Sequence, residues 1–204
     1  MTTDERAIEI YKTYIDVICP YILEYELLTN EFPVEILNEI RAIFTHLSKF
    51  YLSESDVIKE KNISKAEGHI KRSLLDCYKY LCMVYDDEYK RFEKMYSRID
   101  LSLVDNGEFL PKINESRQRA IVLMKNARKS DLAVDSDDEV NCEEAYKKYE
   151  GAFIAYSSVK ELLDNSHKKL DYLKKKVVIK DFFSISGWVI GIIGIILTII
   201  AFIF

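Results

Sequence analysis

The chain has 204 residues, of which 31% are charged and 49% are hydrophobic, and its formal net charge at pH 7 is −5. This length allows one helical domain of ordinary size and a small additional segment. Residues 1–167 hold 23 basic and 32 acidic side chains. An acidic body repels a phosphate backbone, so we expect no nucleic acid as the main partner.

The first 180 residues are interrupted by only three prolines and three glycines, and apolar residues recur there at intervals of three and four. This period predicts an all-α fold, with residues 1–130 forming a cytosolic antiparallel helical bundle. We expect a first helix over residues 4–28, with Pro20 as a kink or a break, and a second helix that begins at Pro33. A third over residues 62–103 and a fourth over residues 111–129 follow.

Two apolar stripes define the expected core of this bundle. The second helix contributes a stripe made of Ile36, Ile40, Ile43, Leu47 and Phe50. The third helix contributes an aromatic stripe at heptad spacing, made of Leu75, Tyr78, Cys82, Tyr85, Tyr89, Phe92 and Tyr96. An aromatic row with this spacing favours a buried helix seam over an exposed stacking platform.

The last part of the chain predicts one long helix after an acidic connection at residues 131–142. From residue 143 to residue 181 its apolar positions alternate steps of four and three, which is a heptad pattern typical of a coiled coil. Residues 185–204 then carry no charge, and twenty helical residues extend roughly 30 Å, the thickness of a bilayer core. We therefore expect residues 182–204 to be a C-terminal transmembrane anchor of a tail-anchored, single-pass protein.

The heptad register continues into the expected anchor and meets only small or hydroxyl-bearing residues there. These are Ser184, Gly187, Gly191, Gly194, Thr198 and Ala201. Small residues on one face allow membrane helices to approach closely. The pattern favours a homo-oligomer that associates through the C-terminal helix.

Lysines precede the apolar run. Residues 168–180 carry six lysines and one aspartate, and Lys174, Lys175, Lys176 and Lys180 lie nearest to the expected membrane. Basic residues at one flank predict a cytosolic N-terminal domain, and they are attracted to anionic lipid headgroups.

Few residues have the chemistry of a catalytic or ligand site. The four cysteines, Cys19, Cys77, Cys82 and Cys142, match no zinc or redox spacing, so we expect no bound metal and no cofactor. Arg41 and His46 form an R-x4-H pattern that resembles the motif of HEPN-type ribonucleases, although Ala42 stands where that family often has a polar residue. The resemblance implies that Arg41 would hold a phosphate and that His46 would be a general acid or base.

A second polar stripe contains His69, Arg72, Asp76 and Lys79, at steps of three, four and three on the third helix. The spacing predicts an Arg72–Asp76 pair. His69 and Arg72 are candidates to bind an anionic small-molecule trigger, and a solvated face is the alternative.

The overall layout also resembles known families. A helical domain with a heptad helix and a terminal anchor is similar to a syntaxin-type SNARE and to small bacterial membrane effectors of antiphage defence. These resemblances imply a non-enzymatic protein that self-associates at a membrane and perturbs it. The alternatives are a membrane-tethered ribonuclease and an adaptor that recruits a protein partner.

Overall fold

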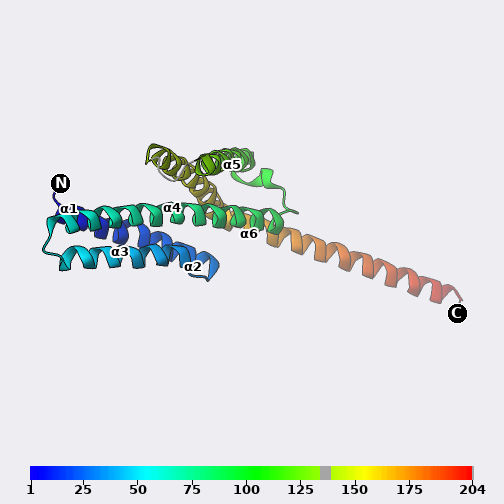
Figure 1. Cartoon of the computed structure of the whole chain (residues 1–204). Helices are drawn as coiled ribbons and strands as arrows, with labels where there is room; N and C mark the ends of the chain where they lie inside the picture. The colour runs from blue at the N-terminus through cyan, green and yellow to red at the C-terminus, as the bar shows by residue number, and fades with distance from the viewer. Residues whose placement is uncertain (134–138, 204) are drawn as a thin grey trace.

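The computed structural model describes the backbone of residues 1–133 and 139–203, and the side chains of most of these residues. Helices make up 91% of the chain, and the described part contains no strand. This confirms the predicted all-α class and the helical bundle. Figure 1 shows a group of packed helices from which the last helix extends to a distant C-terminus.

The N-terminal arm is one helical rod in three parts: α1 (Thr3–Thr13), a π-helical turn (Tyr14–Ile18) and α2 (Cys19–Thr29). A capping box between Thr2 and Glu5 starts the arm. The π turn ends two residues before Pro20, which lacks the N–H that a regular α-helix would use there. The predicted interruption near Pro20 is confirmed, and its form is a π turn. Asn30 ends the arm in the left-handed conformation, with a φ of 58°.

Two helices form the centre of the bundle. The first, α3 (Val34–Leu52), begins immediately after Pro33, as predicted. The second, α4 (Asp56–Met95), is 40 residues long and packs against α1, α2, α3 and α6. The predicted seam on α4 is buried from Tyr78 to Tyr96, and Leu75 is partly buried. The aromatic stripe is therefore core, as expected.

The third predicted helix differs from α4 at both ends. It begins six residues earlier than expected, at Asp56, and ends at Met95 instead of continuing to residue 103. After α4 the chain forms two short 3₁₀ turns, Leu101–Leu103 and Asp105–Gly107. Asp100 accepts hydrogen bonds from the backbone N–H and the hydroxyl of Ser102. Such local side-chain bonds compete with helix continuation, and α-helix resumes at α5 (Phe109–Ala133).

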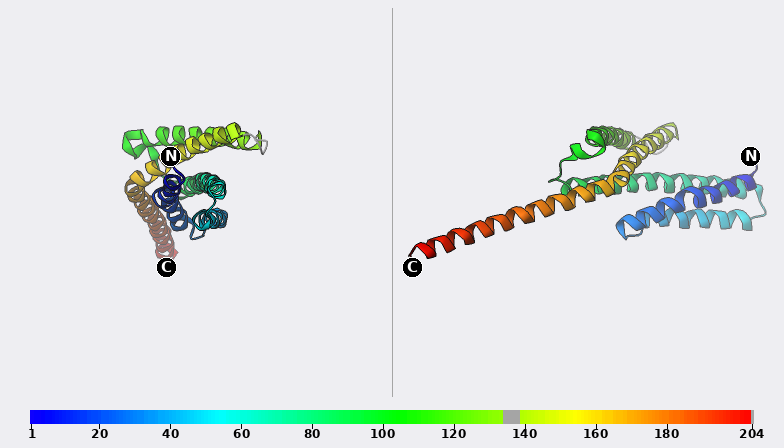
Figure 2. Two further views of the ribbon diagram at one scale, coloured as in Figure 1. Left: turned by 60° about the vertical axis from the view of Figure 1, so that its left-hand side comes forward. Right: turned by 180° about the vertical axis from the view of Figure 1, so that it is seen from behind.

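The last helix, α6 (Glu139–Ile203), is continuous over 65 residues. Its first part packs against α5 and α4, and the predicted stripe is buried at Tyr149, Tyr156 and Val159 and again at Ser166, Leu170 and Leu173. After Leu173 no described side chain of α6 is buried, and the helix extends away from the bundle, as the right-hand view in Figure 2 shows. The predicted long C-terminal helix is therefore present.

The expected membrane location requires correction. Among the described residues, no helix contains an apolar stretch long enough to cross a membrane. This finding contradicts the expectation of a single-pass protein with residues 182–204 as its anchor and a cytosolic N-terminal domain.

The exit of α6 from the bundle is held by a hydrogen bond between helices. The Tyr96 hydroxyl at the end of α4 donates to Asp171 at 2.6 Å. We expect Tyr96→Phe to lower the melting temperature by roughly 2–4 °C, because one interhelical hydrogen bond is lost in a chain of this size. Amide hydrogen exchange should also become faster around residues 165–175. The exposed Tyr172→Phe is the control, and equal effects of the two variants would contradict the assignment.

Candidate functional site

A polar cluster lies where α3 crosses α4, and it contains residues that the sequence had placed in two separate patterns. The imidazole rings of His46 and His69 stack with centroids 5.3 Å apart and planes inclined by 19°. Asn62 contacts the first ring, and Glu39 contacts the second. We call Glu39, His46, Asn62, His69 and Arg72 the histidine cluster.

The hydrogen bonds of the cluster fix where its protons lie. The Asn62 amide nitrogen donates to the carbonyl of Ile58 at 2.9 Å, so its oxygen faces His46 and accepts from Nδ1 at 3.0 Å. Asn62 is buried, and this bond satisfies its side chain. His46 therefore has a structural role in this arrangement, because it pairs a polar group that lies inside the core.

Glu39 is the acceptor at the other end of the cluster. His69 Nδ1 lies 2.7 Å from Glu39 Oε2, and Arg72 Nε lies 3.1 Å from the same oxygen. Arg72 Nη2 is also 2.8 Å from His69 Nδ1, but a nitrogen that donates to a carboxylate cannot accept a second donor, so we assign the Nδ1 proton to the Glu39 bond. Burial by itself would raise the pKa of Glu39, but hydrogen bonds from His69 and Arg72 outweigh it and lower the pKa below its ordinary value.

These contacts bear on two predictions from the sequence, the Arg72–Asp76 pair and the binding of an anion by His69 and Arg72. Arg72 pairs with Glu39 of α3 and not, as predicted, with Asp76 on its own helix. The two groups proposed to receive an anionic ligand, His69 and Arg72, both bond the same carboxylate. An anion would have to compete with Glu39 for them, and binding of an anionic trigger stays a prediction.

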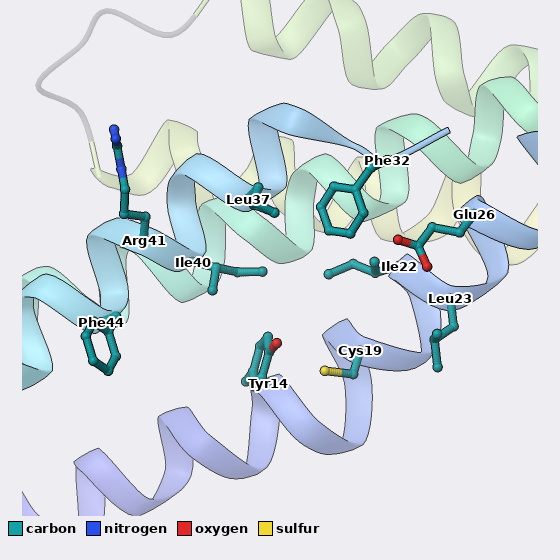
Figure 3. Close-up of a pocket in the computed structure, with 10 residues that line it drawn as sticks. All are labelled: Tyr14, Cys19, Ile22, Leu23, Glu26, Phe32, Leu37, Ile40, Arg41 and Phe44. Atoms are coloured by element: carbon teal, nitrogen blue, oxygen red, sulfur yellow. The ribbon is translucent and has the colours of Figure 1, made fainter. Parts of the chain in front are cut away.

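Arg41 and His46 do not converge on one site. Five residues on a helix correspond to a rotation of about 140°, so the two side chains leave α3 on different faces. Arg41 lines an apolar groove between the N-terminal arm and α3, whereas His46 faces α4. Figure 3 shows Arg41 pointing away from the other groove-lining side chains. The ribonuclease reading stays a prediction, but the geometry within one chain gives no joint phosphate site.

The groove itself was not found from the sequence. It is an open hollow of about 560 Å³ between the π turn, α2 and α3, and Figure 3 shows Ile22, Phe32 and Ile40 directed into it. Its rim is apolar and exposed, because Leu23 and Phe44 are 58% and 73% exposed. One sequence pattern could have predicted the groove. Val34, Leu37 and Phe44 form a second apolar face on α3, beside the predicted stripe.

The predicted surface of α6 is described only in part. Gly187 and Gly191 lie in open space, with no atom within 4 Å of an added Cβ. The side chains of Ser184, Gly194, Thr198 and Ala201 lie outside the described residues. Helix packing through the small-residue face therefore stays a prediction.

The lysines that precede this segment differ in their surroundings. Lys174 is partly buried and lies over the Tyr96 ring, with its nitrogen 5.6 Å from the ring centroid. Lys176 lies over Tyr172 at 4.8 Å. Lys175 and Lys180 are exposed. One of the four lysines thus contacts the end of the bundle.

The two buried cysteines, Cys77 and Cys82, have structural roles. Burial raises the pKa of the thiols of Cys77 and Cys82 to about 12, which makes both thiols unreactive and is typical of cysteines that pack in a core. Within the described residues, no three His, Cys, Asp or Glu side chains are grouped in a way that would hold a metal ion.

The separation of Arg41 and His46 predicts different effects of two alanine variants. His46→Ala should lower the free energy of unfolding by about 1–2 kcal/mol, because it leaves the Asn62 oxygen buried without a donor. Arg41→Ala should change it by no more than about 0.5 kcal/mol, as for most surface substitutions. Urea unfolding measures both values. A large loss with Arg41→Ala and none with His46→Ala would contradict this geometry.

The lowered pKa of Glu39 predicts a pH dependence. Its ionised form is favoured in the folded chain, so its stabilisation is present above the unfolded pKa of roughly 4.3 and is lost as pH falls through the folded value. Glu39→Gln should therefore cost a few tenths of a kcal/mol to about 1 kcal/mol at pH 6, since the pair is partly exposed. The difference from the unsubstituted chain should disappear near pH 3. A difference that is constant from pH 3 to pH 6 would refute the assignment.

Comparison with known proteins gives no family for this arrangement. No family model, curated protein or solved structure matches the chain. The function is therefore argued from the geometry of this chain alone.

Proposed function

We propose that this protein is a non-enzymatic, self-associating helical protein in which the C-terminal part of α6 is the assembly element. The observation that carries the proposal is the exposure of apolar side chains along the extended helix. Trp188 is 73% exposed, Ile190 70% and Ile195 62%, and Ile192 and Ile193 are each about half exposed.

Exposure of this kind is unfavourable for an isolated chain in water. Each square ångström of apolar surface removed from water contributes roughly 25 cal/mol, so burying several isoleucines and a tryptophan offers a substantial driving force. A contiguous apolar surface on a protein usually marks a contact site. Since α6 has left the bundle by Leu173, the described helices of the same chain supply no cover for it.

The charge distribution also supports contact between copies. Residues 168–180 carry a net charge of +5, whereas residues 1–167 carry −9. Chains with a basic segment and an acidic body attract one another when opposite patches meet, which accelerates encounter and orients the contact. A second copy of the chain therefore offers a partner of suitable charge.

The two alternative functions rest on weaker observations. A ribonuclease that uses Arg41 and His46 would need both side chains at one phosphate, and in this chain they lie on different faces of α3. An adaptor would use the same apolar part of α6 to bind a different protein. An adaptor would associate only when another protein is added.

Removing residues 182–204 tests the proposal. The bundle should remain folded, because Leu173 is the last buried side chain among the described residues of α6. The melting temperature of the bundle should change by no more than about 2 °C. The shortened chain should be monomeric in size-exclusion chromatography with light scattering, whereas the full chain should be oligomeric.

Two matched variants control for the loss of chain length. Trp188→Ser with Ile192→Ser should reduce oligomer formation, whereas Ile154→Ser, at an equally exposed position within the bundle, should not. A full-length chain that is monomeric at all concentrations would contradict the proposal. So would a monomer that floats with lipid vesicles, or one that associates only when another protein is added.

A further inference from the structure

The groove between the N-terminal arm and α3 is an open surface lined mostly by apolar side chains. It is bordered by two antiparallel helical segments, and apolar residues from both of them line it. The exposed rim residues Leu23, Leu37 and Phe44 add apolar surface on either side. Grooves of this type receive the apolar face of a further helix.

The charges around the groove specify the kind of helix that fits. Between residues 13 and 40 the chain carries six carboxylates and no lysine or arginine. Three of the six have partners inside the bundle, because Glu24 bonds Tyr85, Glu35 bonds Tyr80 and Glu39 bonds His69 and Arg72.

The other three carboxylates are Asp16, Glu26 and Glu31. Asp16 and Glu31 are exposed, and Glu26 lines the groove. A helix that combines an apolar face with basic residues at one end would complement both the groove and these charges.

This chain carries such a helix. The described side chains between Trp188 and Ile195 are apolar and exposed, and Lys180, Lys176 and Lys175 precede them on the same helix. Lys180 lies eight residues before Trp188, or about 12 Å along the helix axis. The apolar segment and the lysines therefore arrive together at any surface that α6 contacts.

The segment cannot reach the groove of its own chain. From Leu173, where α6 leaves the bundle, 22 residues of continuous helix lead to Ile195, a distance of about 33 Å. Figure 1 shows this part extending away from α2 and α3. An occupant from the same sequence must therefore come from a second copy.

We infer that the groove between the N-terminal arm and α3 receives the Trp188–Ile195 part of α6 from a second copy of this chain. The lysine end of the segment lies near Glu26 and Glu31, at the end of α2. The uncharged end lies toward Arg41, where lysines would be repelled. The inference rests on the proposed function and specifies the partner surface for the assembly element.

This contact joins two different surfaces, so each copy keeps one free groove and one free α6 end after pairing. Such a heterologous contact continues until a ring closes or a filament grows. The assembly should therefore exceed a dimer, and its size should increase with concentration unless a ring forms. A two-fold α6–α6 pair would instead stop at a closed number of copies.

Disulfide trapping tests the contact, because Cys19 already lines the groove and is partly exposed. In a Cys142→Ser background of the full chain, single cysteines are introduced as Ile190→Cys, Ile192→Cys and Ile193→Cys. At least one of them should give an intermolecular crosslink on mild oxidation, since bridged cysteines need Cα atoms within roughly 7 Å. The control Ile154→Cys is equally exposed on the same helix and should give none.

Replacing Cys19 by serine separates the competing contacts. Crosslinks that disappear with Cys19→Ser support the groove. Crosslinks that persist show α6 pairing with α6, which overturns the groove inference and leaves self-association intact. No crosslink from any of the three positions also overturns it.

Groove variants give a second, non-covalent test. Leu23→Ser with Phe44→Ser should weaken association at least tenfold in light-scattering titrations, and both positions are exposed enough for the fold to persist. Val57→Ser, on the exposed start of α4, should leave association unchanged. If removal of residues 182–204 abolishes association but the groove variants do not, only the groove inference fails. If removal has no effect, the proposed function fails as well.

Discussion

The bundle depends on hydrogen bonds between the tyrosine hydroxyls of α4 and side chains on the neighbouring helices. A buried tyrosine ring contributes much apolar surface, but its hydroxyl must find a hydrogen-bond partner or it destabilises the fold. For the tyrosines of α4 and for Tyr96, directly after it, the partners come from four other helices: Tyr80 bonds Glu35 of α3, Tyr85 bonds Glu24 of α2, Tyr89 bonds Asn114 of α5, and Tyr78 and Tyr96 bond Tyr146 and Asp171 of α6. One helix thus fixes the position of four others through directional bonds.

The same condition explains why the bundle ends where it does. Tyr96 is the last aromatic residue of the α4 seam, and α4 stops one residue before it. Beyond the level of Tyr96 and its partner Asp171, α6 has no aromatic row to pack against, and no described side chain of α6 after Leu173 is buried. The length of α4 therefore sets how much of α6 belongs to the bundle and how much extends as a separate helix.

Sequence periodicity predicted the parts of the fold that depend on local repetition. The buried stripes on α3, α4 and α6 follow from heptad spacing, and the interruption at Pro20 follows from a missing donor. The chain that follows α4 was predicted poorly, because Asp100 and Ser102 form side-chain bonds that no apolar pattern reveals. The stacking of His46 on His69 was also missed, since it joins residues 23 positions apart on two helices whose relative position only the fold determines. The membrane location was inferred from an uncharged run alone, and the described residues contradict it.

The π turn at Tyr14–Ile18 has a consequence for the orientation of the whole N-terminal arm. A π turn contains one residue more than an α turn, so α2 is rotated by about 100° from the direction it would have in an uninterrupted helix. Ile22 reaches the core in this orientation, while Leu23 and Leu27 face solvent. Deleting a single residue from this turn would therefore exchange inward and outward side chains along α2 while leaving its composition and helix propensity almost unchanged. The number of residues in the π turn therefore determines which side of α2 faces the core. Insertions or deletions in this turn would be far less tolerated than substitutions.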